Sequence, residues 1–201
     1  MKDEKKLSFE IREIELEDIA PVYALGEKLF TADKWTSLHR TWDEYEVLNL
    51  YMGDGDTCLV AEHDSKVVGF ALGATIEKRR SSWKYGYLLW LGVAPETKGM
   101  GVGKKLVKRM TELFIQDGAR MMLVDTDAEN DDAISFFKKS GFANEQRHVY
   151  MSMNLTKHPS YERLRPHKPE RKNPNTKAQN HERPQSCSLV HRFRAAAAMA
   201  E

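Results

Sequence analysis

The spacing of hydrophobic residues changes several times between residues 7 and 93, and each change predicts a different element. Apolar and charged residues alternate over residues 7–14, which is typical of a half-buried strand. Apolar residues then recur every three or four positions over residues 18–30, which predicts a helix with Asp18 as its N-cap. A second helix is expected over residues 35–52. Three strands follow, and the first two form a hairpin through a polar turn; the strands are 57–62, 67–76 and 85–93, and the turn is 63–66.

The spacing of hydrophobic residues over residues 101–155 predicts two more helices and two more strands. Helix 101–116 places apolar residues on one face and basic residues on the other, and helix 131–139 begins after a capping Asn130. Strands are expected at 120–126 and 148–155. The strand, loop, helix and strand in the middle form a right-handed crossover unit, and the hairpin before it makes the sheet mixed. We therefore expect an α/β (α+β) fold.

The net charge of +1 conceals a break in composition near residue 156. Residues 156–201 contain ten Lys/Arg and four Asp/Glu, a net charge of +6, which leaves −5 for residues 1–155. The later segment is rich in proline and charge and cannot bury enough apolar surface to offset its ordering entropy. We predict a folded domain over 1–155 and a disordered, basic tail over 156–201. The tail is expected to be solvated; nucleic acid is not expected as a partner, and contact through the tail alone is the alternative.

The ends of the chain and its cysteines bear on location. The first ten residues are charged and lack an apolar core, so no secretory signal is predicted, and no apolar run is long enough to span a membrane. The two cysteines, Cys58 and Cys187, lie far apart, which favours a reducing compartment over a disulfide or a zinc site. We expect a cytoplasmic protein with no metal and no membrane partner.

The segment 88–106 (LLWLGVAPETKGMGVGKKL) carries the most distinctive chemistry. Gly99, Gly101 and Gly103 stand at alternate positions before a helix, where bare backbone amides can converge on an anion. The lysine pair that follows would oppose the helix dipole unless an anion sits there; its alternative is to face solvent. The loop lacks the hydroxyl residue of a Walker loop and the spacing of a dinucleotide loop, although Asp125 lies where a ribose-binding acid would. We expect a phosphate ligand.

This loop resembles the acetyl-CoA loop of the GNAT N-acetyltransferases, whose pattern is [QR]-x-x-G-x-[GA] after V-x-P. Lys98 stands where glutamine or arginine is usual. Residues 130–142 (NDDAISFFKKSGF) resemble a second motif of the family, N-x-x-A-x-x-[LF]-[YF]-x-x-x-G-F. The resemblance covers roughly residues 8–155. It implies a mixed, centrally splayed sheet of six to seven strands, flanked by about four helices.

The resemblance also implies acetyl-CoA as the cosubstrate. Its diphosphate would lie on the loop amides, and its pantetheine arm would pair with backbone groups between two splayed parallel strands. Asn130 would hydrogen-bond the arm or serve only as an N-cap, and Gly92 would mark a bulge beside the splay. The implied cofactor-binding residues are Leu91, Val93, Lys98, Gly99, Met100, Gly101, Val102, Gly103, Lys104, Asn130 and Phe137.

The implied reaction is direct attack of a primary amine on the thioester in a ternary complex. Asp125 is the candidate general base, and the amide of Val93 is the candidate oxyanion donor. The alternative for Asp125 and Asp127 is that they are strand-end acids bonded to turn amides. The family's usual tyrosine acid is replaced by Phe137; a thiol with a pKa of about 8.5 can leave as the thiolate without it, or another tyrosine can supply the proton, and the candidates are Tyr85, Tyr87 and Tyr150.

The acceptor is left open by the sequence. The family's acceptor region lies between the first two helices and the strand after Gly141, and its acidic and aromatic residues suit a cationic amine or a peptide N-terminus. The candidates there are Asp33, Trp35, Trp42, Asp43, Glu44, Tyr45, Glu145, Arg147 and His148. We predict an acetyl-CoA-dependent N-acetyltransferase acting on a protein N-terminus, a lysine or a small-molecule amine, as a monomer or homodimer. The alternative is a non-catalytic or weakly catalytic acyl-CoA-binding regulatory module.

Overall fold

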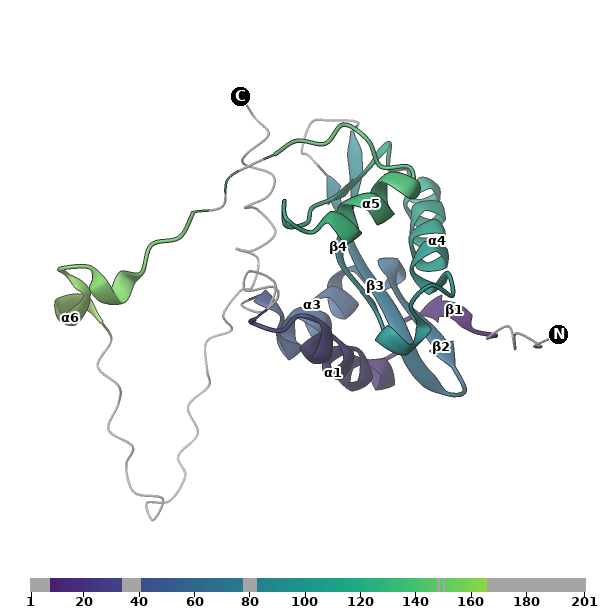
Figure 1. Ribbon diagram of the computed structural model, residues 1–201, viewed down its shortest axis with the longest axis horizontal. Coiled ribbons are helices and arrows are strands. Elements are labelled where there is room, and N and C mark those ends of the chain that lie inside the picture. The colour runs from purple at the N-terminus through teal and green to yellow at the C-terminus, as the bar shows by residue number, and fades with distance from the viewer. Residues whose placement is uncertain (1–7, 34–40, 78–82, 148, 150, 166–201) are drawn as a thin grey trace, which may run out of the picture. The chain divides into compact units, whose positions relative to one another are not determined.

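The computed structural model describes residues 8–33, 41–77, 83–147, 149 and 151–165, and it divides into two compact units, Met1–Asn144 and Glu145–Glu201. The described part of the first unit contains a five-stranded mixed sheet with the order β1-β2-β3-β4-β5 (Figure 1). Its strands are β1 (Glu10–Glu13), β2 (Cys58–His63), β3 (Lys66–Glu77), β4 (Lys84–Val93) and β5 (Met121–Val124). Its helices are α1 (Ile19–Leu29), α3 (Glu44–Asp54), α4 (Val102–Gln116) and α5 (Asp131–Lys139), and α6 (Tyr161–Leu164) lies in the second unit. The expected mixed α/β fold is confirmed.

The strands follow one another in sheet order, and the direction changes only at the last pair. β1, β2, β3 and β4 pair antiparallel, and β4 pairs parallel with β5 through the crossover helix α4. The β2–β3 hairpin turns at Asp64 and Ser65, whose φ angles are 48° and 59°. Two successive positive φ angles are typical of a type I′ turn, which matches the twist of the flanking strands.

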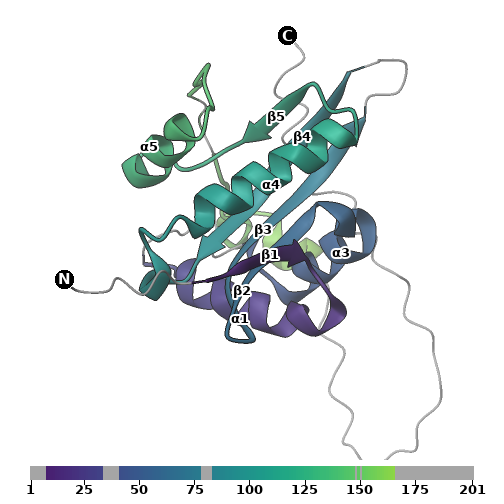
Figure 2. The same ribbon diagram turned by 90° about the vertical axis from the view of Figure 1, so that its right-hand side faces the viewer.

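The sheet separates two layers of helices, as Figure 2 also shows. On one face, Gly69 of β3 packs against Val102 and Leu106 of α4. The next residue, Phe70, points to the other face, where its ring lies 5.4 Å from the ring of Trp42. Because successive side chains of a strand alternate between faces, α4 covers one face, and the aromatic rings of Tyr23, Phe30 and Trp42 cover the other. We call these three residues the Trp42 cluster. We call the two faces the α4 face and the α1 face.

A bulge interrupts β4 at its centre. The register with β3 pairs Leu72 with Trp90 but Gly73 with Leu88, so that Leu89 is an extra residue. The bulge reverses the alternation of faces: Gly86 packs against Phe114 of α4, whereas Trp90 packs against Phe30 on the α1 face. The expectation of a bulge at Gly92 is therefore wrong.

Gly92 is instead a position of close packing. It pairs regularly with Phe70, and a Cβ there would lie 2.6 Å from the Phe70 ring. Glycine is needed at this position because the aromatic core reaches the backbone of β4.

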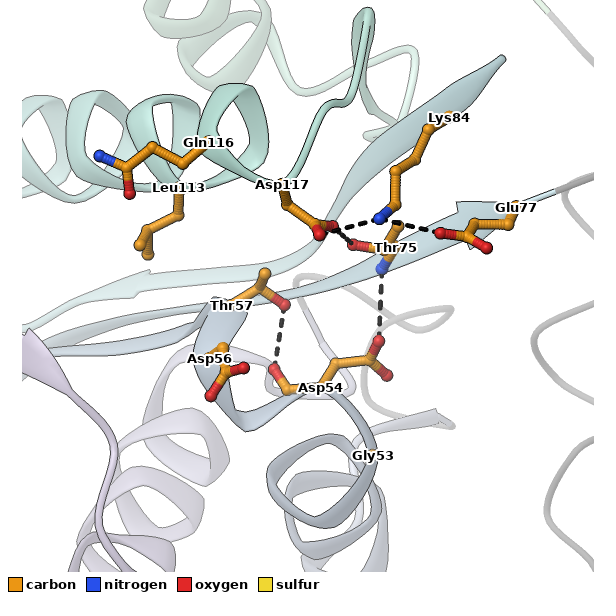
Figure 3. A pocket seen from close by; sticks show the side chains of 10 residues that line it. All are labelled: Gly53, Asp54, Asp56, Thr57, Thr75, Glu77, Lys84, Leu113, Gln116 and Asp117. Carbon is orange, nitrogen blue, oxygen red and sulfur yellow. Dashed lines mark hydrogen bonds and ion pairs between the residues drawn. The ribbon is translucent and has the colours of Figure 1, made fainter. Parts of the chain in front are cut away.

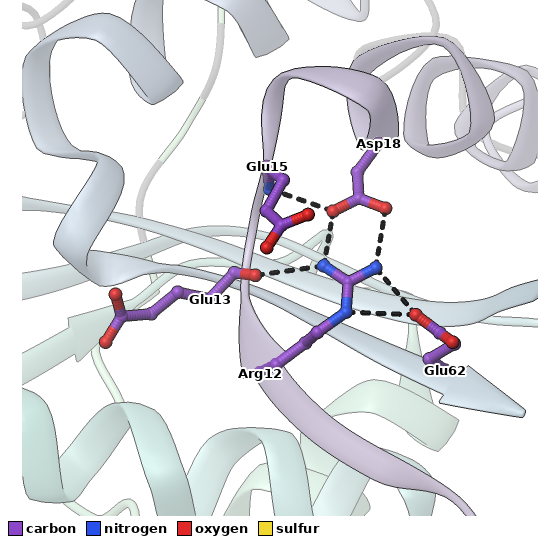
Figure 4. Close-up of polar contacts among 5 residues, drawn as sticks. All are labelled: Arg12, Glu13, Glu15, Asp18 and Glu62. Carbon is purple, nitrogen blue, oxygen red and sulfur yellow. Dashed lines mark hydrogen bonds and ion pairs between the residues drawn. The ribbon is translucent and has the colours of Figure 1, made fainter. Parts of the chain in front are cut away.

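The start of α1 is tied to the sheet by a charged cluster (Figure 4). Arg12 on β1 donates to both carboxylate oxygens of Asp18, at 2.6 and 2.9 Å, and to Glu62 on β2, at 2.7 and 2.9 Å. Asp18 is buried and also accepts the amide of Glu15 at 2.8 Å. Although burial alone would raise it, the hydrogen bonds from Arg12 and the Glu15 amide hold the pKa of Asp18 below its ordinary value.

Asp18 occupies the N-cap position of α1 as expected, but its side chain makes no capping hydrogen bond with that helix. Arg12 takes both of its oxygens instead.

Two other elements differ from expectation. The second helix starts at Glu44, capped by Asp43, whose side chain accepts the amide of Tyr45 at 2.7 Å; residues 34–40 lie outside the described residues. Residues 149 and 151–154 are not in a strand, and residues 148 and 150 lie outside the described residues.

The apolar side chains of that segment, Val149, Met151 and Met153, are 85%, 85% and 73% exposed. An alternating pattern fixes a strand only where a neighbouring strand satisfies its backbone, and the sequence period carries no information about that neighbour. The described sheet therefore has five strands where six to seven were expected.

Candidate functional site

The glycine loop presents a row of backbone amides at the start of α4. Gly99 and Gly101 adopt φ angles of 85° and 83°, and Gly101 is the N-cap residue of the helix. An added Cβ at either glycine would meet nothing within 4 Å, so the positive φ, and not crowding, favours glycine there. The amides of Val102, Gly103 and Lys104 belong to the first helical turn and have no earlier carbonyl of the helix to bond. They lie at the positive end of the helix dipole, whereas the amides of Lys98 and Met100 donate within the loop to the carbonyls of Pro95 and Thr97.

β4 and β5 separate next to this loop. They pair only from Tyr85 with Met121 to Leu88 with Val124, and β4 then continues alone on that side to Val93. The amide of Ala94 donates to the carbonyl of Val68 on β3 at 2.9 Å. Because successive backbone groups alternate in direction, the amides of Val93 and Leu91 point away from β3, into the gap beyond β5. The gap therefore has backbone donors and acceptors at its edge and the glycine loop at its end.

Three lysines surround the loop, and two of them have contacts within the described residues. Nζ of Lys98 lies 3.4 Å from Asp132 at the start of α5, in an exposed ion pair. Nζ of Lys105 lies 4.2 Å from the centre of the Phe9 ring. Lys104 is exposed on the first turn of α4. Their positive charge favours an anionic ligand on the loop amides.

Asn130 and Phe137 hold α5 in place. Asn130 Oδ1 accepts the amide of Ala133 at 3.1 Å, and its Nδ2 donates to Thr126 at 3.3 Å. Asn130 is thus an N-cap, and its amide nitrogen keeps a second hydrogen for another acceptor. Phe137 is 9% exposed and packs against Phe142, with their ring centres 5.4 Å apart. It fills the core and has no proton to donate.

Tyr87 and Asp125 meet where the strands separate. The phenol of Tyr87 donates a hydrogen bond to Oδ1 of Asp125, which follows the end of β5. Burial, the negative charge of Asp125 and this hydrogen bond all raise the pKa of Tyr87 above its ordinary value, because each disfavours the phenolate. The pair combines a proton acceptor on an exposed carboxylate with a phenol that stays protonated.

Asp127, by contrast, bonds a turn amide, which is the role that the alternative interpretation gave to both Asp125 and Asp127. Its Oδ1 accepts the amide of Glu129 at 3.0 Å, and its carbonyl accepts the amide of Asn130 at 3.0 Å. It closes the turn before α5. The two aspartates, which the sequence could not distinguish, are therefore different in the structure.

The candidate acceptor-binding residues differ in how accessible they are. Trp42 is 5% exposed in the aromatic core and is therefore unavailable to a substrate, contrary to expectation. Asp43 caps α3. Asp33, Glu44 and Tyr45 are exposed in the first unit, and Glu145 and Arg147 form an ion pair of 3.6 Å in the second. Trp35, His148 and Tyr150 lie outside the described residues.

A cavity of about 560 Å³ lies at the other end of the sheet (Figure 3). It is lined by the end of α4, the end of β3 and the start of β4, where Lys84 bonds Glu77 and Asp117, each at 2.8 Å. Since α4 begins at the glycine loop and ends at this cavity, the cavity is not part of the loop site. Within the described residues, no group of three or more His, Cys, Asp or Glu could hold a metal ion, and no helix is long and apolar enough to cross a bilayer.

Residues 27–142 match the sequence profile of the Acetyltransferase (GNAT) family. The match covers more than half of the chain, so the chain belongs to this family, as the two motifs indicated. The glycine loop, the crossover helix and the strand gap lie within it.

Two curated relatives are N-acetyltransferases by name. N-alpha-acetyltransferase 30 of Schizosaccharomyces pombe is 29% identical over 88 residues, 42% of this chain and 59% of the relative. An uncharacterized N-acetyltransferase of Methanocaldococcus jannaschii is 26% identical over 145 residues, 69% of this chain and 62% of the relative. The matched segments thus span about three fifths of the length of these relatives.

Solved structures share the fold. Ard1 from Thermoplasma volcanium has a TM-score of 0.58 at 25% identity, covering 69% of this chain and 84% of that one. An aminoglycoside acetyltransferase from an uncultured soil metagenomic sample, solved with trehalose, has a TM-score of 0.59 at 22% identity, covering 73% and 97%. The aminoglycoside N-acetyltransferase AAC(6')-Iy, solved with CoA, has a TM-score of 0.58 at 19% identity, covering 72% and 99%.

Proposed function

We propose that this protein is an acetyl-CoA-dependent N-acetyltransferase that transfers the acetyl group to a primary amine by direct attack. The observation that carries the proposal is the gap between β4 and β5, which has the glycine loop at its end and the Tyr87–Asp125 pair where the strands separate. The relatives and neighbours named above include enzymes named for protein N-termini and for aminoglycosides, so both amine classes are candidates.

The residues present fit acetyl-CoA. The amides of Val102, Gly103 and Lys104 at the start of α4 have no carbonyl partner in the helix, which suits the diphosphate. The backbone groups of Leu91 and Val93 point into the gap and can pair with the amide groups of the pantetheine arm, as an added strand would. The second hydrogen of Asn130 Nδ2 can bond the same arm. Acetyl-CoA supplies a thioester, whose carbonyl carbon is the electrophile.

The side chains at the gap account for the proton transfers. A free alkylamine has a pKa of about 10.4 and must lose a proton before it attacks. Asp125 takes this proton, directly or through one water, while Tyr87 fixes the position of its carboxylate. The amine nitrogen forms the new C–N bond, the C–S bond breaks, and the amide of Val93 stabilises the carbonyl oxygen. A thiol with a pKa of about 8.5 leaves as the thiolate, which takes up a proton from water, because the raised pKa of Tyr87 makes its phenol a poor proton donor.

Calorimetric titration with acetyl-CoA, joined to a thiol-release assay, tests the proposal. A carboxylate in Gly101→Asp would stand beside the diphosphate; two like charges 4 Å apart repel by about 4 kcal/mol at an effective dielectric constant of about 20. The Kd should therefore rise by about two orders of magnitude or more.

Gly118→Asp is the matched control, because Gly118 also has a φ of 83° and open space around its Cβ but lies beyond the far end of α4. Equal affinities of the two variants would overturn the loop assignment.

Phe137 favours one second candidate, a regulatory module that binds acyl-CoA and turns it over slowly. The side chain of Phe137, in the position of the family's usual acid, has no acidic proton to give to the leaving thiolate. Thiol release that does not depend on any added amine, with tight acetyl-CoA binding, would support this candidate over the enzyme.

A further inference from the structure

The α1 face of β4 and β5 carries a continuous row of large apolar side chains that ends at the proposed reaction centre. Tyr85 and Tyr87 pair with Met121 and Leu123, and paired residues share a face of the sheet. Met122 between them contacts Thr111 of α4, so Met121 and Leu123 point to the opposite face. Trp83 continues the row, with its ring stacked on Tyr85 at 6.2 Å between centres and 27° between planes. We call these five residues the aromatic strip.

The strip is accessible to a ligand. Trp83 and Met121 at its outer end are 44% and 45% exposed, and the tyrosines are half-buried. The aromatic contacts of Trp42 with Phe70 and Trp90 lie beyond the bulge, on the other half of β4. A contiguous exposed apolar row on a soluble unit marks a binding surface.

The two ends of the strip have opposite charges. Asp125 stands at the inner end, bonded to Tyr87. At the outer end, the guanidinium of Arg120 lies 5.7 Å from the centre of the Trp83 ring, is exposed, and forms no ion pair with any residue that the structure describes. Arg120 lies level with Lys84, whose carbonyl accepts its amide at 2.9 Å, and from Tyr87 to Lys84 the strand rises by three residues, about 10 Å at about 3.3 Å per residue.

We propose that the aromatic strip binds the first four residues of an extended peptide acceptor, with its α-amine at Asp125, apolar side chains along the strip and an acidic fourth residue at Arg120. This proposal rests on the proposed function and names its acceptor class. An extended peptide rises by the same distance per residue as β4, so its fourth residue reaches Arg120 when its amine is at the gap. A polyhydroxylated aminoglycoside would leave its hydroxyl groups against apolar side chains, without hydrogen-bond partners.

The experiment measures acetyl transfer from acetyl-CoA to two hexapeptides that have three apolar residues followed by Glu or by Lys. The wild type should prefer the Glu peptide by about two- to fivefold in kcat/KM, the range expected for one exposed ion pair. Arg120→Glu should reverse the preference. Lys108→Glu makes the same charge change on the exposed face of α4 and should leave the preference as in the wild type.

Trp83→Ala should raise the KM of the Glu peptide by about tenfold and leave that of a dipeptide amide within about twofold, because the dipeptide does not reach the outer end. Ile115→Ala, which removes an exposed apolar side chain from α4, is the control for general loss of surface apolar area.

A preference that Arg120→Glu leaves unchanged overturns the inference, as does acetylation of kanamycin or spermidine with a kcat/KM above that of both peptides. In either result amine-dependent thiol release continues, so the proposed function stands. Absence of thiol release with every amine instead contradicts the proposed function itself.

Discussion

The hydrogen bond between Tyr87 and Asp125 leads to the sharpest mechanistic prediction. Asp125→Asn keeps the shape of the side chain but removes its ability to take a proton. General base catalysis typically contributes about 10²–10⁴-fold, or about 2.7–5.5 kcal/mol in the activation free energy. Asp125 is exposed, so bulk water can partly replace it, and we expect kcat to fall by about a hundredfold. The Kd of acetyl-CoA should change by less than about twofold, because Asp125 does not contact the glycine loop.

Tyr87→Phe tests the positioning role of the phenol. A hydrogen bond to a charged group is worth about 1.5–3 kcal/mol when buried, which corresponds to a loss in kcat of about tenfold to a hundredfold. Because Tyr87 is only half-buried, we expect the loss in kcat to be no larger than this. Because Tyr87 acts through Asp125, adding Tyr87→Phe to Asp125→Asn should cost little more.

The pH dependence carries a sign that can be checked. The raised pKa of Tyr87 keeps the phenol protonated through pH 10, so the wild-type rate should show no alkaline loss from Tyr87 below that pH. In Asp125→Asn the negative charge beside the phenol is gone, and the pKa of Tyr87 should fall toward its ordinary value. Phenolate absorbance during an alkaline titration measures this shift, with Tyr87→Phe as the blank.

Asp127 provides the control for the predicted role of Asp125. Asp127→Asn disturbs only the turn before α5 and should keep kcat within about threefold of wild type. If Asp125→Asn behaves like Asp127→Asn in the thiol-release assay, Asp125 is not the base. If the double variant instead loses the product of the two single losses, Tyr87 has a role of its own.

Three further outcomes are expected. Arg12→Met leaves the buried Asp18 without its cation and should lower the unfolding free energy by about 2–3 kcal/mol in denaturant titrations. Because the pKa of Asp18 is held below its ordinary value, its contribution is present above about pH 4 and is lost on acidification, so the variant should lose less stability between pH 5 and pH 2. Asp132→Asn frees Lys98 for the diphosphate and should lower the Kd of acetyl-CoA by about twofold, and by less at high salt. An unchanged Kd would show that the ion pair does not affect acetyl-CoA binding. Removal of residues 157–201, beyond the boundary proposed from composition, should leave that Kd and the melting temperature unchanged.

The sequence was most informative where local chemistry decides the structure. Positive φ angles at Gly99 and Gly101 are inherent in a glycine-rich start of a helix, and Asn130 caps α5 as its side chain favours. Such features depend on neighbours within a few residues. The loop half of the candidate site and the helices beside it could therefore be predicted.

The half of the candidate site that holds the proposed base depends on strand register, which a single sequence does not fix. Tyr87 was only one of several candidate tyrosines, and its contact with Asp125 follows from the pairing of Tyr87 with Leu123, two residues before the aspartate. Trp42 was predicted to contact the acceptor, because an aromatic residue beside acidic ones is typical of a surface binding site, but it is buried. Its burial follows from Phe70 and Trp90, which are distant in sequence.

The extra residue at Leu89 sets the phase of the whole second half of β4. Were β4 one residue shorter, Trp90 would turn toward α4, and the backbone groups that face the gap would come from the neighbours of Leu91 and Val93. Pairing with β5 also stops at Leu88, immediately before the extra residue. One inserted amino acid thus divides β4 into a segment that pairs with strands on both sides and a segment that, within the described sheet, pairs only with β3.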